Sequence, residues 1–314
     1  MHDVRGRTLT DAEWAVAFEQ HRRAIRAHCY RMLGSFDAAE DAVQDTLLRA
    51  WKARESFRHD AQLATWLYRI ATNVCIDRAS EKRILPQDIV PSVQPTDEPR
   101  STPPFRPDLP WLTPFPDDLE RKERIELAFL VALQQLPVKQ RALLLLCDVI
   151  GWTAAEAAEL VDMSVPAVTS ALQRAHQAMP AAPKPPTDDD RALLDRYIAA
   201  WESGDASALT LLLADDVRFA MPPAALWFAG KAAVENLFVN YPMTFHGHHR
   251  LVPISANNQL AAAAYMRGHG QEEFRFGGIH VLAMHAGQIT DITSFGVGLC
   301  HAFDLPMRFS QLPV

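Results

Sequence analysis

The sequence predicts a multidomain protein with two all-α blocks followed by an α+β domain. At 314 residues it is longer than one hydrophobic core normally supports, which is about 250 residues. Two proline-rich breaks, at residues 86–118 and 179–187, interrupt any regular helix or central strand. Apolar residues follow a helical spacing before the second break, whereas short strand-like runs dominate after residue 217.

Composition narrows the class of protein. Hydrophobic residues make up 48% and charged residues 22%, which is typical of a globular chain. No apolar run of about 18 residues occurs, and the polar N-terminal stretch does not resemble a signal peptide, so we expect no membrane span. The four cysteines are scattered without a CxxC pair, which indicates free thiols rather than disulfides or a zinc site. We therefore expect a soluble, cytoplasmic protein with no metal and no cofactor.

The net charge of −7 is unusual for a nucleic-acid binder, but it is unevenly distributed. Residues 1–85 carry a balance of +2, residues 86–121 a balance of −4, and residues 122–186 a balance of zero. The remaining −5 lies in residues 187–314. Because the acidity falls in the proline-rich segment and the last domain, it does not exclude DNA binding by the helical blocks.

The first block predicts three amphipathic helices. The first has an apolar stripe at steps of three and four and ends at Gly34. That stripe consists of Trp14, Phe18, His21, Ile25, Cys29 and Met32. A second helix begins near Asp37, and a third covers about Leu63 to Arg83. The third has a polar face at four-residue steps, which is most simply a solvated helix face. Its members are Thr65, Arg69, Asn73 and Asp77, with Arg78 beside them.

The second block predicts two helices over 125–136 and 138–149, followed by a pair of shorter ones. Thr153 and Glu156 fit a capping box at the start of one short helix, and Ser164 fits the N-cap of the next. A tight turn at Asp162-Met163 separates them. Two short helices joined in this way match a helix-turn-helix, although an ordinary αα-hairpin fits the same pattern. The second helix would present Ala167, Thr169, Ser170, Gln173 and Arg174 outward.

Several motifs in these blocks resemble those of one family. His28-Cys-Tyr-Arg-Met-Leu-Gly34 and Asp37-Ala-Ala-Glu-Asp-Ala-Val-Gln-Asp-Thr-Leu-Leu-Arg-Ala-Trp51 closely resemble region 2 of extracytoplasmic-function (ECF) RNA polymerase sigma factors. Leu63-Ala-Thr-Trp-Leu-Tyr-Arg-Ile-Ala-Thr-Asn-Val-Cys-Ile-Asp-Arg78 looks like their −10 recognition helix. The segments 136–146 and 168–176 are similar to region 4. The segments 111–117, 220–223 and 227–230 narrow the resemblance to the SigG-like group, whose members carry a C-terminal SnoaL-like, NTF2-like domain.

The resemblance implies roles for particular residues. Five residues would dock the clamp helices of the polymerase β′ subunit: Asp41, Gln44, Asp45, Leu48 and Trp51. The −10 element would meet Arg58, Thr65, Arg69, Asn73, Asp77 and Arg78. The −35 element would meet the outward face of the second helix-turn-helix helix, and region 4 would bind the β flap. The implied partners are therefore core RNA polymerase and promoter DNA, and neither helical block would perform covalent chemistry.

The predicted −35 helix departs from the family pattern in its charge. Arg174 is the only Arg or Lys between Asp162 and Pro180, and His176 occupies a position where relatives often have arginine. Because phosphate contacts by Arg and Lys provide much of the affinity for DNA, we expect weak −35 binding by this helix alone. Specificity would then depend on Ser, Thr and Gln contacts and on DNA shape.

The last block predicts helices followed by a curved antiparallel sheet, the α+β cone implied by the resemblance. Five residues are candidates for lining a ligand cavity, although aromatic residues at such positions can equally well fill a core. They are Trp227, Phe228, Tyr265, Phe276 and Asp291, and the aromatic residues Tyr241, Phe245 and Phe295 extend the set. His280, His285 and Asp291 are candidate general bases, but no two of them form a convincing pair in the sequence. The cluster His246-Gly-His248-His249 is interpreted as polar surface rather than a metal site.

We therefore expect four parts: region 2 at 12–85, a linker at 86–121, region 4 at 122–180 and the SnoaL-like cone at 188–314. The expected function is that of a sigma factor whose cone regulates it in cis, with a small-molecule ligand for the cone left open. Two alternatives are a DNA-binding regulator that works without polymerase and a small-molecule enzyme of the NTF2-like fold with a helical interaction module.

Overall fold

The computed structural model describes residues 10–57, 62–79, 82–94, 105–116, 126–180, 185–240 and 247–310. The chain divides into two compact units. The helical unit consists of Met1–Arg83 and Leu119–Ala182, and the linker–cone unit consists of Ile84–Asp118 and Pro183–Val314. The proline-rich linker thus belongs with the C-terminal domain rather than with the helices that it joins. Within the described residues, no helix is long and apolar enough to cross a membrane.

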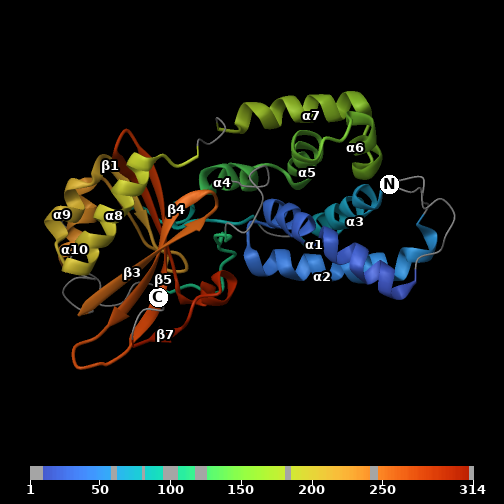
Figure 1. Ribbon diagram of the computed structural model, residues 1–314. Coiled ribbons are helices and arrows are strands. Elements are labelled where there is room, and N and C mark those ends of the chain that lie inside the picture. The colour runs from blue at the N-terminus through green and yellow to red at the C-terminus, as the bar shows by residue number, and fades with distance from the viewer. Residues whose placement is uncertain are drawn as a thin grey trace. The chain divides into compact units, whose positions relative to one another are not determined.

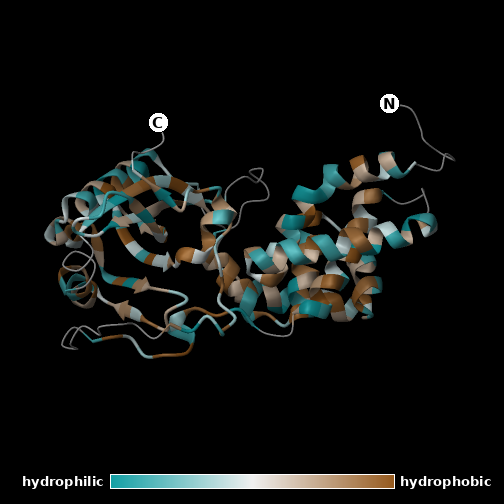
Figure 2. Cartoon of the chain, turned by 90° about the horizontal axis from the view of Figure 1, so that it is seen from below, coloured by the Kyte–Doolittle hydropathy of each residue, from teal (hydrophilic) through white to brown (hydrophobic). Residues whose placement is uncertain are grey.

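The helical unit contains seven α-helices among its described residues. They are α1 (Asp11–Leu33), α2 (Phe36–Ala53), α3 (Leu63–Arg78), α4 (Leu127–Gln135), α5 (Val138–Leu144), α6 (Ala154–Val161) and α7 (Val165–Ala178). A 3-10 turn, η1 (Arg54–Ser56), follows α2, and a π-helical turn, η4 (Leu145–Ile150), extends α5. The first three helices pack against one another, as Figure 1 shows. Figure 2 shows hydrophilic and hydrophobic residues alternating along the helices, as expected of amphipathic helices.

Local sequence signals account for the helix ends. Thr10 and Glu13 form a capping box at the start of α1, which ends at Gly34 in the left-handed conformation. The predicted box at Thr153 and Glu156 is confirmed: the Thr153 Oγ1 accepts from the Glu156 amide at 3.2 Å. The Glu156 carboxylate accepts from the Thr153 amide at 2.7 Å. The predicted third helix stops at Arg78 instead of Arg83.

The cone begins with two helices, α8 (Asp188–Ser203) and α9 (Ala206–Leu211), and contains one more, α10 (Lys231–Asn240). Its strands are β1 (Leu213–Ala220), β2 (Trp227–Ala229), β3 (His248–Ala256), β4 (Gln259–Arg267), β5 (Phe274–His285), β6 (Gln288–Phe295) and β7 (Arg308–Phe309). A 3-10 segment, η5 (Val297–Phe303), precedes β7, and another, η2 (Pro86–Asp88), lies in the linker.

The sheet is mixed rather than wholly antiparallel, which corrects the sequence prediction. Its order is β2-β1-β6-β5-β4-β3, with β7 paired to β5. Strands β1 and β6 run parallel, with Leu213 opposite Ile289 and Phe219 opposite Ile292. A parallel pair needs a long connection between its strands, and here α10 and four intervening strands, β2 to β5, provide it. Local alternation of apolar residues does not indicate which distant strand becomes the neighbour.

Packing places the cone's core between α8 and the sheet. The helix contributes Leu193, Tyr197 and Trp201, and strand β4 contributes the alternate buried alanines Ala262 and Ala264. Small side chains let α8 approach the strands closely, and α8 contacts both β3 and β4.

Candidate functional site

The polar face predicted on α3 exists, and its members differ in exposure. Asn73 and Asp77 are exposed, whereas Thr65 and Arg69 are half-buried. Arg58, the remaining member of the predicted −10 set, lies outside the described residues. The four-residue spacing therefore brings the described members to one side of the helix.

Charged residues on this face are already paired within the helical unit. The Arg69 guanidinium lies 3.4 Å from the Glu159 carboxylate of α6 and 5.9 Å from the centre of the Trp152 ring. Arg49 donates to Asp77 at 3.1 Å. These exposed pairs are individually weak, on the order of 0.2–1 kcal/mol each, so a competing anion can replace the carboxylates.

Arg78 joins the two surfaces that the sequence assigned to different partners. Its guanidinium donates to Asp45 at 2.6 Å and lies 3.8 Å from Asp41, and both acids belong to the predicted polymerase face on α2. The hydrogen bond to Asp45 raises the pKa of Arg78, so this residue stays charged. The two acidic side chains of α2 thus share one guanidinium of α3.

The predicted polymerase face on α2 is otherwise open. Asp41 and Gln44 are exposed, and Leu48 is 58% exposed. Trp51 is half-buried, with the Arg54 guanidinium 4.3 Å from its ring centre. An exposed leucine between acidic and amide groups is suited to a partner that offers both an apolar contact and arginine or lysine side chains.

An aromatic cluster holds the two described ends of the loop between η1 and α3. Phe57, after η1, lies 5.1 Å from Trp66 of α3 and 5.7 Å from Trp14 of α1, measured between ring centres. Residues 58–61 of this loop lie outside the described residues. This packing fixes the positions of Phe57, where the loop leaves η1, and of Trp66, near the start of α3.

The outward face of α7 contrasts with that of α3. Thr169, Ser170, Gln173 and Arg174 are exposed, as expected of the outward face, whereas Ala167 is half-buried. Val168, Ala171 and Ala175 are buried on the opposite side. Among the described residues, Arg174 makes no ion pair, and the only ion pair on α7 joins His176 to Asp148 at 2.6 Å.

A buried arginine, which the sequence did not indicate, joins α1 to the second helical block. Arg141 of α5 is 5% exposed and donates to the carbonyl of Met32, to the Leu133 carbonyl at 2.9 Å and to Gln134 Oε1 at 2.7 Å. Burial lowers the pKa of Arg141 to about 10, so the guanidinium is still protonated at neutral pH. Gln134 also donates to the Arg31 carbonyl at 3.3 Å. Sequence periodicity cannot identify such a residue, because it lies among apolar neighbours.

The linker residues that the structure describes pair with the cone. Trp227 Nε1 donates to the Val90 carbonyl at 2.8 Å, and the Val93 amide donates back to the Trp227 carbonyl at 2.9 Å. Near the other end, the Phe115 amide donates to Asn257 Oδ1 at 2.9 Å, and the Asn257 amide donates to the Phe115 carbonyl at 3.0 Å. Phe115 is 2% exposed, so the linker forms part of the cone's own packing.

The linker also closes on itself. Ile84 at its start pairs with Trp111 near its end. The Ile84 amide donates to the Pro110 carbonyl at 3.1 Å, and the Leu112 amide donates to the Ile84 carbonyl at 3.0 Å. The two ends of the segment 84–111 are therefore adjacent.

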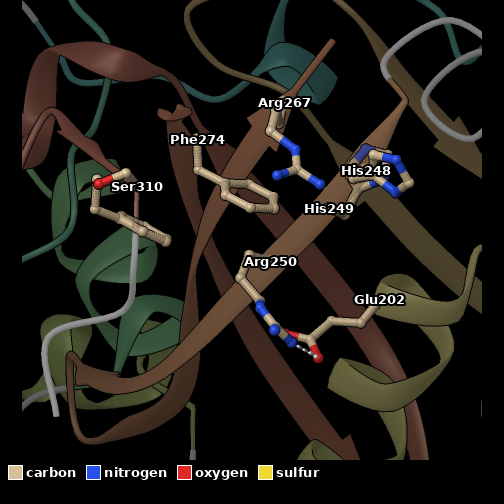
Figure 3. Close-up of a pocket in the computed structure, with 8 residues that line it drawn as sticks. Glu202, His248, His249, Arg250, Arg267, Phe274 and Ser310 are labelled. Carbon is tan, nitrogen blue, oxygen red and sulfur yellow. Dashed lines mark hydrogen bonds and ion pairs between the residues drawn. The ribbon is translucent and has the colours of Figure 1, made fainter. Parts of the chain in front are cut away.

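Described residues of the cone line at least two pockets. The larger is an outer groove of about 500 Å³ that contains Arg250, Arg267 and His248, and Arg250 is paired with Glu202 at 2.8 Å (Figure 3). The Arg267 guanidinium lies 4.6 Å from the ring centre of Phe274 in the same groove. The smaller is an inner cavity of about 130 Å³ that contains Trp201 and His280, and His249 borders both.

The cavity residues chosen from the sequence line neither pocket. Trp227 donates a hydrogen bond to Val90 of the linker, and Phe228 packs in the hydrophobic core of the cone. Tyr265 packs against Phe276, with ring centres 5.5 Å apart, and Asp291 accepts from Arg218 at 2.7 Å. Their role in ligand binding stays a prediction, because aromatic content alone does not show which face of a strand lines a hollow. Tyr241, Phe245 and His246 lie outside the described residues.

Of the candidate bases, His280 lies in the inner cavity. Its Nδ1 is 2.9 Å from the hydroxyl of Tyr197 on α8, and both side chains are buried. His285 is exposed at the end of β5. The partner of His280 is thus a tyrosine 83 residues earlier in the chain, which no local motif indicates.

Comparisons with known proteins agree with this organisation. Three family models match successive parts of the chain: Sigma-70 region 2 over residues 17–84, Sigma-70 region 4 over residues 126–179, and the SnoaL-like domain over residues 194–292. The ECF RNA polymerase sigma factor SigG of Mycobacterium tuberculosis is 40% identical over 301 residues, covering 88% of this chain and 79% of SigG. SigM of the same species is 29% identical over 160 residues, covering 50% of this chain and 70% of SigM.

A solved structure shows the same fold. The crystal structure of the M. tuberculosis ECF sigma factor SigJ matches with a TM-score of 0.61 and 20% identity, covering 93% of this chain and 100% of that one. The order of the matched domains and the identity to SigG over most of both chains show the family. The chain belongs to the ECF family of RNA polymerase sigma factors and carries a C-terminal SnoaL-like domain.

Proposed function

We propose that this sigma factor binds core RNA polymerase through α2, reads the −10 element through α3 and the −35 element through α7, and is regulated in cis by its cone. The four parts expected from the sequence keep their roles in this proposal. The observation that carries it is the coexistence of a polar, partly basic face on α3 and a separate exposed face on the helix-turn-helix helix α7. The protein positions and melts DNA, and the polymerase supplies the chemistry.

In this proposal the helical unit must open before both elements can be bound. The −10 and −35 elements lie roughly 25 base pairs apart, or about 85 Å along B-DNA. Region 2 and region 4 instead contact each other through Arg69 and Glu159 and through Arg141 and the Met32 carbonyl. Binding to polymerase and promoter would exchange these internal contacts for contacts with the partners.

The linker supplies a physical basis for regulation in cis. Its complete length from Ile84 to Glu126 could span about 140 Å when extended. When Ile84 is paired with Trp111 and Leu112, only the residues from Thr113 to Glu126 remain as a tether, which spans at most about 50 Å. Docking of the linker on the cone therefore limits how far region 4 can move from region 2.

Variants that loosen the docking test this proposal. Trp227→Phe removes the N–H that donates to Val90, and Asn257→Gly removes the acceptor for Phe115 while tolerating the left-handed backbone at that residue. Each hydrogen bond contributes about 1 kcal/mol, so the double variant should shift the docking equilibrium by about tenfold or more. Asn258→Gly makes the same backbone change one residue later and serves as the control.

The measurement is promoter-specific run-off transcription with core polymerase, together with limited proteolysis between residues 84 and 118. We expect the double variant to be cleaved faster and to transcribe more strongly than the wild type or Asn258→Gly. Faster cleavage with unchanged transcription across all promoters would contradict regulation by linker docking. Absence of any polymerase-dependent transcript, with tight binding of the protein alone to an operator, would contradict the sigma-factor role.

A further inference from the structure

The inner cavity of the cone has the size of a single ring. It encloses about 130 Å³, and Trp201, Phe219, Leu237 and Met266 contribute apolar wall. An apolar cavity of about 150 Å³ in another protein is large enough to bind benzene. The cavity is thus matched to a molecule of one ring with a small substituent.

Polar groups interrupt this apolar wall at one place. His280 of β5 is 7% exposed, and its Nδ1 is occupied by the Tyr197 hydroxyl at 2.9 Å. Among the described residues no partner for His280 Nε2 exists, and His280 is part of the cavity wall. A nitrogen that lacks a protein partner in a nine-tenths buried side chain is a group that a ligand can satisfy.

The Tyr197 contact fixes which nitrogen of His280 carries the proton. Burial lowers the pKa of His280 to about 4, so the ring is neutral at pH 7, and burial raises the pKa of Tyr197, so the phenol keeps its proton. Among the described residues, His280 Nδ1 is the one acceptor within hydrogen-bonding distance of that phenol. The phenol O–H therefore donates to Nδ1, and a neutral imidazole then carries its hydrogen on Nε2.

Trp201 supports the same direction of donation. Its ring centre lies 6.2 Å from that of Tyr197 and 5.4 Å from that of His280, and its buried Nε1 makes no hydrogen bond of normal geometry. The neighbouring Trp201 side chain opposes the rise in the pKa of Tyr197 that burial causes, as expected where an N–H is near the phenol oxygen. The phenol hydrogen is therefore available to His280 Nδ1, and His280 carries its own hydrogen on Nε2.

The charge around the cavity favours a neutral ligand. Arg250 and Arg267 border the outer groove and are not part of the inner cavity wall, and Arg250 is already paired with Glu202. The inner wall offers His249, His280 and Ser294 as its polar side chains. Burying a carboxylate there without a cation would cost several kcal/mol.

From this geometry we propose that the cone binds a neutral carbonyl compound of one ring, with the ring packed among Trp201, Phe219 and Leu237 and the carbonyl oxygen accepting from His280 Nε2–H. Ligand binding of this kind goes beyond the transcriptional role and does not depend on that role, because binding requires only a folded cone.

The test uses the full chain with ¹⁵N-labelled histidine and three probes: acetophenone, its isostere cumene without the oxygen, and benzoate. Long-range ¹H–¹⁵N spectra at pH 7 should show His280 as the Nε2–H tautomer before any addition. Acetophenone should shift the Nε2 signal saturably and bind at least fivefold more tightly than cumene or benzoate. A His280 that carries its proton on Nδ1, equal binding of acetophenone and cumene, or no binding of acetophenone would each overturn the proposal.

Two variants and a control locate the site. Tyr197→Phe removes the donor to Nδ1, so both tautomers should appear and the affinity for acetophenone should fall at least threefold. Ala264→Leu fills part of the cavity wall and should abolish the Nε2 shift. His285→Gln changes an exposed histidine on the same strand and should leave the titration unchanged. Retention of full affinity by a folded Ala264→Leu protein would place the ligand elsewhere and refute the assignment.

Discussion

The two helices proposed to read DNA differ in how their outward faces are occupied. On α3, Arg69, Asp77 and Arg78 each have an oppositely charged partner within the helical unit. On α7, all the outward-facing residues except the half-buried Ala167 are exposed, and Arg174 has no ion-pair partner in the part of the chain that the structure describes.

In the proposed function, this difference predicts two modes of DNA binding. Binding by α3 would be an exchange, in which phosphates replace carboxylates and polymerase assists by engaging Asp41 and Asp45 on α2. Binding by α7 would require no exchange, but a single arginine would supply little electrostatic attraction. We therefore expect α3 to bind DNA strongly, but only after its internal ion pairs are exchanged. We expect α7 to bind DNA weakly through a face that is already exposed.

The largest expected effect comes from the buried group that joins the two helical blocks. Arg141→Met leaves the carbonyls of Met32 and Leu133 without this donor and should lower the free energy of unfolding by about 3 kcal/mol. Urea denaturation measures it, with Lys52→Met, a change at an exposed residue of α2, as the control. A loss below 1 kcal/mol would mean that Arg141 does not stabilise the packing of α1 against the second helical block.

The second prediction removes the basic residue at the centre of the α3 face. Arg69→Ala should weaken binding of the single-stranded −10 element by the holoenzyme at least tenfold, because it loses a charge-assisted phosphate contact. Arg23→Ala, an exposed change on α1 with the same loss of charge, is the control. Equal effects of the two variants on −10 affinity would show that only net charge matters.

The third prediction concerns α7. Arg174→Ala should lower affinity for duplex −35 DNA about threefold to tenfold at 0.1 M salt and reduce the salt slope by about one. Fluorescence anisotropy over a salt series measures both quantities, with Arg191→Ala on α8 as the charge control. Tight binding of the Arg174→Ala protein to this duplex at 0.2 M salt would contradict a weak, arginine-dependent α7.

The smallest expected effect is a gain of binding. Glu159→Gln removes the carboxylate partner of Arg69 and should raise the affinity for −10 DNA about twofold to fivefold at low salt. The gain should disappear at high salt, where exposed charges are screened. Glu55→Gln is the matched control, and a gain of the same size in that variant would remove the exchange argument for α3.

Local signals in the sequence predicted most of the helical unit. The apolar stripe of α1, the capping box at Thr153 and the cap at Ser164 were all sufficient to place helices, because they depend on residues three or four positions apart. The same spacing placed the outward faces of α3 and α7. The ion pairs on α3 were not predictable, because Arg69 and Glu159 are 90 residues apart.

The sequence predicted the fold of the cone but not which residues line its pockets. Strand alternation indicated the sheet, yet the parallel pairing of β1 and β6 depends on a crossover that no local pattern encodes. Trp227 was chosen for a cavity because it is aromatic, whereas the linker engages it. Tyr197 and His280 share the interior only after α8 packs on the sheet, so their pairing is a property of tertiary packing.

The pairing of Ile84 with Trp111 has a consequence for how the linker tolerates changes in length. Since the ends of the segment between them are adjacent, residues inserted there enlarge a closed loop without changing the spacing of the domains. Doubling such a loop costs only about 0.6 kcal/mol in closure entropy. We therefore expect an affinity tag inserted between Val93 and Phe105 to leave the tether from Thr113 to Glu126 unaltered.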